Sequence, residues 1–123
     1  MRLTSKDILA SPPPLFHCFG LVLGLIASIT HGCSIVFPSE TFDPVKTLQA
    51  VLKERCTALH GVPAMFSAQL ELLEPNMKFP HLRTGIAAGS PVSQKMMEDL
   101  RASMNLLEIT NTYGVLCIPE RSV

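Results

Sequence analysis

From Ile8 to Ser39 the chain contains no Asp, Glu, Lys or Arg. Such a stretch is long enough to span a lipid bilayer, for which about 20 apolar residues suffice. However, three prolines open it and two histidines lie inside it, and its strongly apolar part, Phe19 to Ile29, has only 11 residues. That length favours a buried helix, which we predict over residues 19–31 with Gly32 at its end. A small protein anchored in a membrane through residues 15–37 is the alternative.

The balance of apolar and charged residues restricts the partners that the chain can have. Of its 123 residues 47% are hydrophobic and 16% are charged, and its net charge is zero. This composition suits a segment whose outer faces are covered by other parts of a longer chain. Without a cluster of basic residues there is no positive field to attract nucleic acid. Since the chain has one tyrosine and no tryptophan, we also expect no platform for base stacking.

The cysteines indicate a reducing compartment. They stand at positions 18, 33, 56 and 117, without the C-x-x-C spacing of a metal or redox site, and the four histidines are equally scattered. We predict reduced, mostly buried cysteines, no metal site and an intracellular protein, because disulfides persist mainly outside the cell. The sequence does not distinguish cytoplasm, mitochondrion and peroxisome.

Segments typical of strands alternate with segments typical of helices. This alternation predicts an α/β fold with a mostly parallel sheet and right-handed crossovers. Asp43-Pro44 and Ser90-Pro91 each combine an N-cap residue with a proline at the first helical position, so a helix is expected to begin at each. The predicted strands are Cys33–Phe37 (buried), Thr57–His60, Arg83–Ala88 and Glu108–Thr112, and the remaining helix faces are Phe66–Leu70–Leu73 and Val92–Met96–Leu100–Met104.

Parallel sheets bind ligands outside the carboxyl ends of their strands. In this chain those ends lead into Ala88-Gly89-Ser90-Pro91 and into Tyr113-Gly114. We therefore expect any ligand site to be formed by these two loops.

Four stretches together carry a family likeness. They are Pro13 to Gly20 (PPLFHCFG), Gly61 to Phe66 (GVPAMF), Arg83 to Pro91 (RTGIAAGSP) and Asn111 to Gly114 (NTYG). With these stretches in this order and at these separations, the chain resembles the AMP-dependent acyl-CoA synthetases of the adenylate-forming superfamily, most of all the fatty-acid and medium-chain ligases. The likeness implies that residues 1–114 are part of the large N-terminal AMP-binding domain and that residues 115–123 form a divergent tail.

The resemblance implies a two-step ligase reaction. A fatty or other carboxylic acid attacks ATP to give an acyl-adenylate and pyrophosphate, and coenzyme A then displaces AMP. The full-length family uses ATP, coenzyme A and Mg²⁺. The protein would contribute by positioning the reactants and by stabilising the charge of the phosphates.

The resemblance also assigns roles to residues. His17 matches the histidine near the acyl and thiolation site and is the candidate catalytic residue. Ala88, Gly89, Ser90 and Pro91 match the turn whose backbone contacts the adenylate, and a helix beginning at Pro91 would direct free N–H groups there. The adenine side would be formed by Asn111, Thr112, Tyr113 and Gly114, with Tyr113 stacked on the ring.

The chain departs from the family after Gly114. The family has Thr and Glu, which hold phosphate and Mg²⁺, where this chain has Leu116 and Cys117. Leucine cannot donate a hydrogen bond to phosphate, and a thiol is a poor ligand for a hard cation. The phosphate loop, the ribose-binding Asp, the hinge and the C-terminal domain with its lysine also have no counterpart here. We therefore predict a ligase fragment that is inactive alone and binds no cofactor productively; a non-catalytic module that binds adenine or acyl groups, or that regulates the enzyme, is the alternative.

Overall fold

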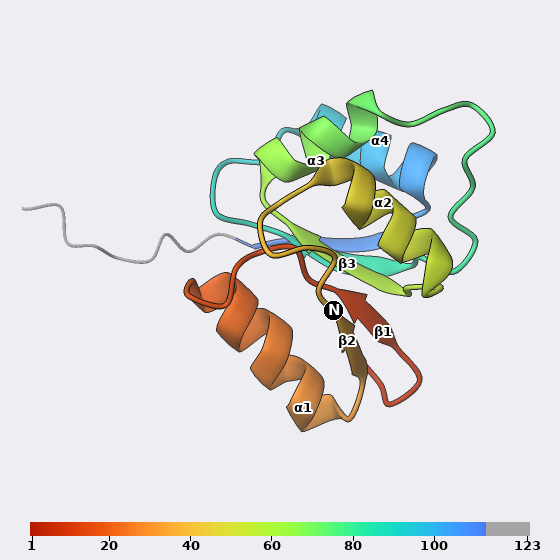
Figure 1. Cartoon of the computed structure of the whole chain (residues 1–123). Coiled ribbons are helices and arrows are strands. Elements are labelled where there is room, and N and C mark those ends of the chain that lie inside the picture. Colours follow the sequence, from red (N-terminus) through yellow and green to blue (C-terminus); the bar gives the residue numbers. More distant parts are fainter. Residues whose placement is uncertain (113–123) are drawn as a thin grey trace, which may run out of the picture.

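The computed structural model describes residues 1–112, which form a parallel five-stranded sheet with helices on both faces (Figure 1). The strand order is β2-β1-β3-β4-β5, and every neighbouring pair is parallel. The strands are β1 (Ile8–Ala10), β2 (Ser34–Val36), β3 (Ala58–Gly61), β4 (Thr84–Ala87) and β5 (Glu108–Asn111). The prediction of an α/β fold with a parallel sheet is confirmed, and the four predicted strands are displaced by at most one residue at either end.

Strand β1 was not predicted from the sequence. It is an internal strand, between the edge strand β2 and the central strand β3, although it has only 3 residues. The chain runs from β1 outward to β2 and then back across β1 to β3, so the strand order reverses between β1 and β3. In open α/β sheets ligands bind at such a switch point, beyond the carboxyl ends of the strands.

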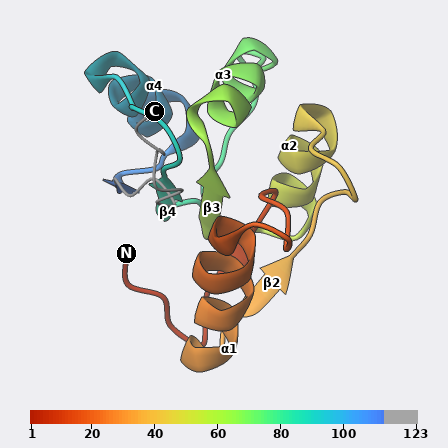
Figure 2. The same ribbon diagram turned by 90° about the vertical axis from the view of Figure 1, so that its left-hand side faces the viewer.

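Three helices cover one face of the sheet and one irregular helix covers the other (Figures 1 and 2). The irregular helix is a π-helix, η1 (Phe19–Ile26), that continues directly into α1 (Ala27–His31). None of the helices within residues 1–112 is long and apolar enough to cross a bilayer. The other three helices are α2 (Pro44–Lys53), α3 (Pro63–Glu71) and α4 (Gln94–Met104).

Two predicted helix ends are confirmed by their capping geometry. Asp43 is the N-cap of α2, where its carboxylate accepts a hydrogen bond from the Lys46 N–H at 3.1 Å, and Pro44 is the first helical residue. Gly32 ends α1 in the left-handed conformation, with φ of 67°. Helix formation over residues 19–31 was therefore predicted correctly, although its π-helical hydrogen bonding was not.

The predicted start of α4 at Ser90-Pro91 is wrong. The helix begins at Gln94, and Ser93 is its N-cap, because the Ser93 hydroxyl accepts a hydrogen bond from the Met96 N–H at 3.2 Å. Gly89 turns the chain with φ of 96°, so the residues after it lead to the helix instead of forming it. The helix face that packs in the core is accordingly Met97, Leu100 and Met104, with Met96 only half-buried.

The prediction that the strand near Cys33–Phe37 is buried is also wrong. Within the described chain, β2 pairs with β1 alone and is an edge strand, in which Ser34 is exposed and Ile35 and Val36 are half-buried. Its run of apolar residues is explained by packing on both faces of the sheet, since Ile35 packs against the small cluster around Leu9 and Val36 packs against the main core.

Candidate functional site

The predicted site residues that the structure describes lie beyond the carboxyl ends of the strands, on the left in Figure 1. We call this side of the sheet its carboxyl edge and the opposite side, where the strands begin, its amino edge. Because the strands are parallel, the segments that follow β1, β3, β4 and β5 all leave the sheet at this edge. His17 lies after β1, Ala88 to Pro91 lie after β4, and Asn111 and Thr112 lie at the end of β5. Tyr113 and Gly114 lie outside the described residues.

The loop after β4 is anchored at its base and exposed at its tip. The Ala88 N–H donates to the Gly61 carbonyl at 3.3 Å, which ties the loop to the end of β3. A Cβ atom on Gly89 would lie 3.0 Å from a methyl carbon of Val62, and φ of 96° also requires glycine there. Ser90 and Pro91 are exposed. The loop therefore presents backbone and small side chains outward from a fixed base.

The end of β5 lies beside the base of this loop. The Thr112 N–H donates to the Ala87 carbonyl at 3.1 Å, and Asn111 is the register partner of Ala87. Asn111 is exposed. The two segments to which the sequence assigned adenylate contacts are thus adjacent.

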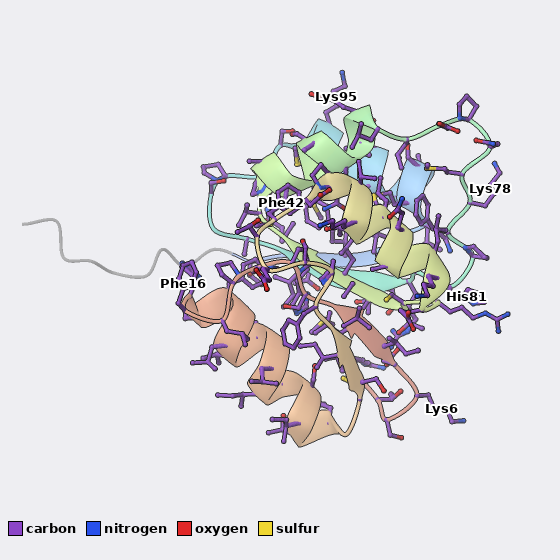
Figure 3. All side chains as sticks on the ribbon, viewed as in Figure 1. Lys6, Phe16, Phe42, Lys78, His81 and Lys95 are labelled. Atoms are coloured by element: carbon purple, nitrogen blue, oxygen red, sulfur yellow. The ribbon has the colours of Figure 1, made fainter. Side chains whose placement is uncertain are left out.

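His17 is exposed and held in a turn at the start of η1. Its ring Nδ1 accepts a hydrogen bond from the backbone N–H of Phe19 at 3.1 Å, and the backbone N–H of His17 donates to the Pro14 carbonyl at 3.1 Å. In the neutral ring the proton therefore lies on Nε2, the nitrogen that takes no part in the bond to Phe19. Phe16 next to it projects away from the molecule with 95% of its surface exposed (Figure 3).

Phe19 connects His17 to the loop after β4. Its buried ring packs with Ile86 and Ala88, and Val62 packs against the same cluster. Although Phe19 belongs to the predicted apolar helix, the sequence did not show that it would pack on the base of the loop after β4. His17 and Ala88 are thereby positioned by one shared hydrophobic cluster.

His60 is the residue of this site that sequence reasoning missed. It is fully buried in β3, and its ring lies 5.5 Å from that of Phe19, centroid to centroid. Its Nδ1 accepts from the Ile86 N–H at 3.3 Å, and its Nε2 lies 3.0 Å from the Leu23 carbonyl oxygen. Burial lowers the pKa of His60 to about 4, against the opposing effect of the Leu23 and Leu59 backbone groups. The available signal was a histidine at the end of a predicted strand, directly before Gly61.

The cysteines fit the prediction in part. Cys18, Cys33 and Cys56 are free, and burial raises the pKa of the Cys56 thiol to about 11. Cys18 is exposed, contrary to the prediction, because it lies in the turn before η1 with its Sγ 3.9 Å from Nδ1 of His17. Within residues 1–112 no three side chains of His, Cys, Asp or Glu come together as a metal-binding group.

A large open cavity lies at the other edge of the sheet. It has a volume of about 780 Å³ and is lined by the ends of α3 and α4 and by residues of the loop between α3 and β4, such as Pro75, Met77 and Phe79. These helix ends lie at the amino edge of the strands, where parallel sheets do not place their ligands. We therefore assign the candidate site to the carboxyl edge.

Comparison with known proteins identifies the family. The model of the AMP-binding enzyme family matches residues 1–115. Acyl-CoA ligase sidI of Aspergillus fumigatus is 58% identical over 116 residues, which are 94% of this chain and 20% of that protein. The mitochondrial medium-chain acyl-CoA ligase ACSF2 of Mus musculus is 35% identical over 115 residues, 90% of this chain and 18% of that protein. The chain thus spans about a fifth of the length of these relatives.

Solved structures agree with this assignment. ATP-bound MatB from Rhodopseudomonas palustris superposes with a TM-score of 0.76 at 25% identity, covering 91% of this chain and 22% of MatB. The N-terminal domain of FACL13 from Mycobacterium tuberculosis has the same fold, with a TM-score of 0.82 at 23% identity, covering 94% and 29% of the two chains. The predicted resemblance to acyl-CoA synthetases is confirmed, and neither the membrane anchor nor the separate binding module is favoured. This chain belongs to the AMP-binding enzyme family.

Proposed function

We propose that this chain is the part of an AMP-forming acyl-CoA ligase that forms the adenylate-facing edge of its sheet. The whole reaction would activate a fatty or other carboxylic acid with ATP and transfer the acyl group to coenzyme A. One observation carries this proposal: in a chain of this family, the loops with His17, Ala88 to Pro91 and Asn111 to Thr112 all leave the same edge of the sheet.

The loop after β4 is suited to bind the adenylate through its backbone. Gly89 has no side chain, so a ligand can approach its peptide closely, and the anchored Ala88 prevents the loop from moving away. Asn111 and Thr112 follow beside it, and we propose that they lead to Tyr113 and Gly114 at the adenine. Such preorganised groups lower the cost of binding a charged phosphate ester.

His17 would act on the acyl side of this loop. Its Nδ1 is occupied by the Phe19 N–H, so Nε2 is the nitrogen that can donate to an acyl or thioester oxygen. The packing of Phe19 on Ala88 fixes the His17 turn relative to the loop that would hold the adenylate. Positioning of this kind is the main contribution that a ligase makes when ATP supplies the activation.

We further propose that the chain alone does not complete the reaction. Mg²⁺ needs hard oxygen ligands and the phosphates need hydrogen-bond donors, whereas Leu116 and Cys117 occupy the positions of the family's Thr and Glu. Residues 1–114 would be the AMP-binding part and residues 115–123 a divergent tail. We expect the protein inside the cell, where free thiols such as Cys56 stay reduced and where ATP and coenzyme A are present.

A pair of segment exchanges tests the proposal. Residues 1–114 of this chain would replace the matching segment of acyl-CoA ligase sidI from Aspergillus fumigatus, and a second chimera would extend the exchange to residue 117. We expect the first chimera to form acyl-CoA. The second should be slower by about 100-fold, the usual cost of losing a group that stabilises transition-state charge.

Two outcomes would contradict the proposal. An inactive first chimera that unfolds at the same temperature as sidI would show that this segment cannot supply the ligase edge. Release of pyrophosphate by the pure 123-residue chain with ATP, Mg²⁺ and a fatty acid would show that Leu116 and Cys117 do not prevent adenylation.

A further inference from the structure

Within the helix after His17, the residue separation between the N–H donor and its carbonyl acceptor changes. Near the start, the Leu21 N–H donates to the His17 carbonyl, four residues back, at 3.0 Å. At the end of η1, the Ala27 N–H points to the Val22 carbonyl, five residues back, and to that of Gly24. In an α-helix the acceptor for Ala27 would be the Leu23 carbonyl. One extra residue is therefore accommodated between these two points, as in other π-helical segments.

The Leu23 carbonyl is used by His60 instead. Since Nδ1 of His60 accepts the Ile86 N–H, the ring proton lies on Nε2, which donates to the Leu23 oxygen at 3.0 Å. The low pKa of His60 agrees with this neutral tautomer. A side chain that takes a carbonyl out of the helical ladder is an established cause of a helix irregularity.

The register matters because the helix contacts the chain before it through glycines. A Cβ atom on Gly20 would lie 2.2 Å from the Pro14 carbonyl oxygen, and one on Gly24 would lie 2.7 Å from the Ser11 hydroxyl. Removing the extra residue would turn one half of the helix against the other by about 100° and move it by about 1.5 Å. Side chains larger than glycine would then face the Pro14 carbonyl or the Ser11 hydroxyl, and the His17 turn would have to move.

We propose that His60 is a positioning residue, which by donating to the Leu23 carbonyl holds the helix in its π-helical register and so sets where His17 lies relative to Ala88. Contacts lead from Leu23 through the His60 ring to Phe19 and from Phe19 both to His17 and to Ala88. His60 touches no substrate in this arrangement and acts through the helix. The link to catalysis rests on the proposed function of His17.

Two substitutions separate the two hydrogen bonds of His60. In His60→Gln the amide nitrogen can take the place of Nε2 and keep the donor to Leu23. In His60→Asn the amide oxygen can take the place of Nδ1 and keep the acceptor for Ile86, while the donor to Leu23 is lost. Both variants remain neutral and polar, so the pair tests which bond sets the register.

The register can be measured directly without ligand. Scalar couplings across hydrogen bonds, in the ¹⁵N,¹³C-labelled 123-residue chain, report which carbonyl accepts each N–H. We expect coupling of Ala27 N to the Val22 carbonyl in the wild type and in His60→Gln, and to the Leu23 carbonyl in His60→Asn. The ¹⁵N shift of His17 Nδ1 should change in His60→Asn alone, because its bond to the Phe19 N–H is disturbed.

Retention of the Ala27–Val22 coupling in folded His60→Asn would overturn the proposal, and so would a wild-type chain that couples Ala27 to Leu23. If His60→Asn does not fold, His60→Gln decides: a folded His60→Gln that keeps the Val22 coupling supports the proposal, and one that loses it overturns it.

The consequence for catalysis is measured in the active chimera described above. We expect His60→Asn to lower kcat for thioester formation by about 10- to 100-fold with an unchanged KM for ATP, since displacement of a reacting group by about 1 Å has effects of this size. His60→Gln should restore most of the rate. An unchanged kcat in His60→Asn would overturn the positioning role, whereas an inactive parent chimera would count against the proposed function and leave the coupling result intact.

Discussion

The two faces of the sheet are built in different ways. The face under α2, α3 and α4 is a continuous apolar core in which Leu59, Phe66 and Leu100 are fully buried. The face under η1 and α1 has only two small apolar clusters, around Leu9 and Phe19, and depends on close backbone approach at Gly20 and on the hydrogen bonds of the buried His60. On the outer side of the helix Val22, Ile26 and Ile29 are exposed. One face thus provides stability through apolar burial, and the other provides a defined geometry next to the candidate site.

The largest effect is expected from truncating the apolar core. Phe66→Ala should lower the free energy of unfolding by about 4 kcal/mol, because it removes a fully buried aromatic ring and leaves a cavity. Urea denaturation of the 123-residue chain measures this. Leu107→Ala, at an exposed position, is the control and should cost less than about 0.5 kcal/mol. A cost for Phe66→Ala no larger than that of the control would mean that this face is not the stabilising one.

The opposite face should be sensitive to added volume instead. Gly20→Ala places a methyl group 2.2 Å from a backbone carbonyl oxygen, which cannot move away as a side chain can. We expect a cost of about 3 kcal/mol, at the upper end for overpacking. Gly24→Ala meets the hydroxyl of Ser11 at 2.7 Å and should cost less, since that side chain can rotate. Thermal unfolding of both variants gives the order; equal costs would show that the backbone contact is not decisive.

A third effect is expected at the amino edge, where a buried carboxylate ties the strands together. Asp7 accepts hydrogen bonds from Thr57 at 2.6 Å and from Arg83 at 2.6 Å. Burial raises the pKa of Asp7, but the hydrogen bonds from Thr57, Arg83 and Thr4 outweigh it and lower the pKa to about 2. A lowered pKa means stability that is present above the unfolded-state value near 4 and is lost as the pH falls toward 2.

The wild-type chain should therefore lose about 2 kcal/mol more than Asp7→Asn between pH 5 and pH 2. Urea titrations at several pH values measure this difference. Parallel pH profiles for the two proteins would show that this carboxylate does not hold the edge.

The smallest effect concerns the start of α4 on the apolar face. Ser93→Ala should cost about 1 kcal/mol through loss of the N-cap bond to Met96, and Ser90→Ala should cost almost nothing. The matched pair distinguishes the observed helix start from the predicted one. A larger cost for Ser90→Ala would place the start of the helix at Ser90-Pro91 after all.

Local chemistry explains which parts of this fold could be predicted. Asp43-Pro44 and Gly32 specify helix ends through their own side chain or backbone, so they are readable from sequence. For α4 the same local chemistry favours Ser90-Pro91, yet the helix begins after Ser93, where the turn at Gly89 and its contact with Val62 direct the chain. Strand β1 is too short to show a pattern, and its existence depends on β2 and β3 on either side.

The candidate site divides in the same way. The loop with Ser90 at the end of its strand was predicted from the parallel topology, whereas His17 was assigned by the family resemblance alone, because strand β1 before it was not predicted. The role of His60 was not predicted, because it depends on the Leu23 carbonyl, 37 residues earlier in the chain. No local pattern reports a contact over that separation, and buried polar residues of this kind have to be found in the structure.

The short strand β1 also determines how the sheet can come apart. It meets β3 through two register pairs, whereas β3 and β4, and likewise β4 and β5, share four each. We therefore expect β3, β4 and β5 to open as one cooperative unit with the core under α2, α3 and α4, which β1 and β2 join through fewer strand pairs. Amide protons of β2 and α1 should exchange with solvent first, through an opening at β1 that leaves the rest of the sheet folded.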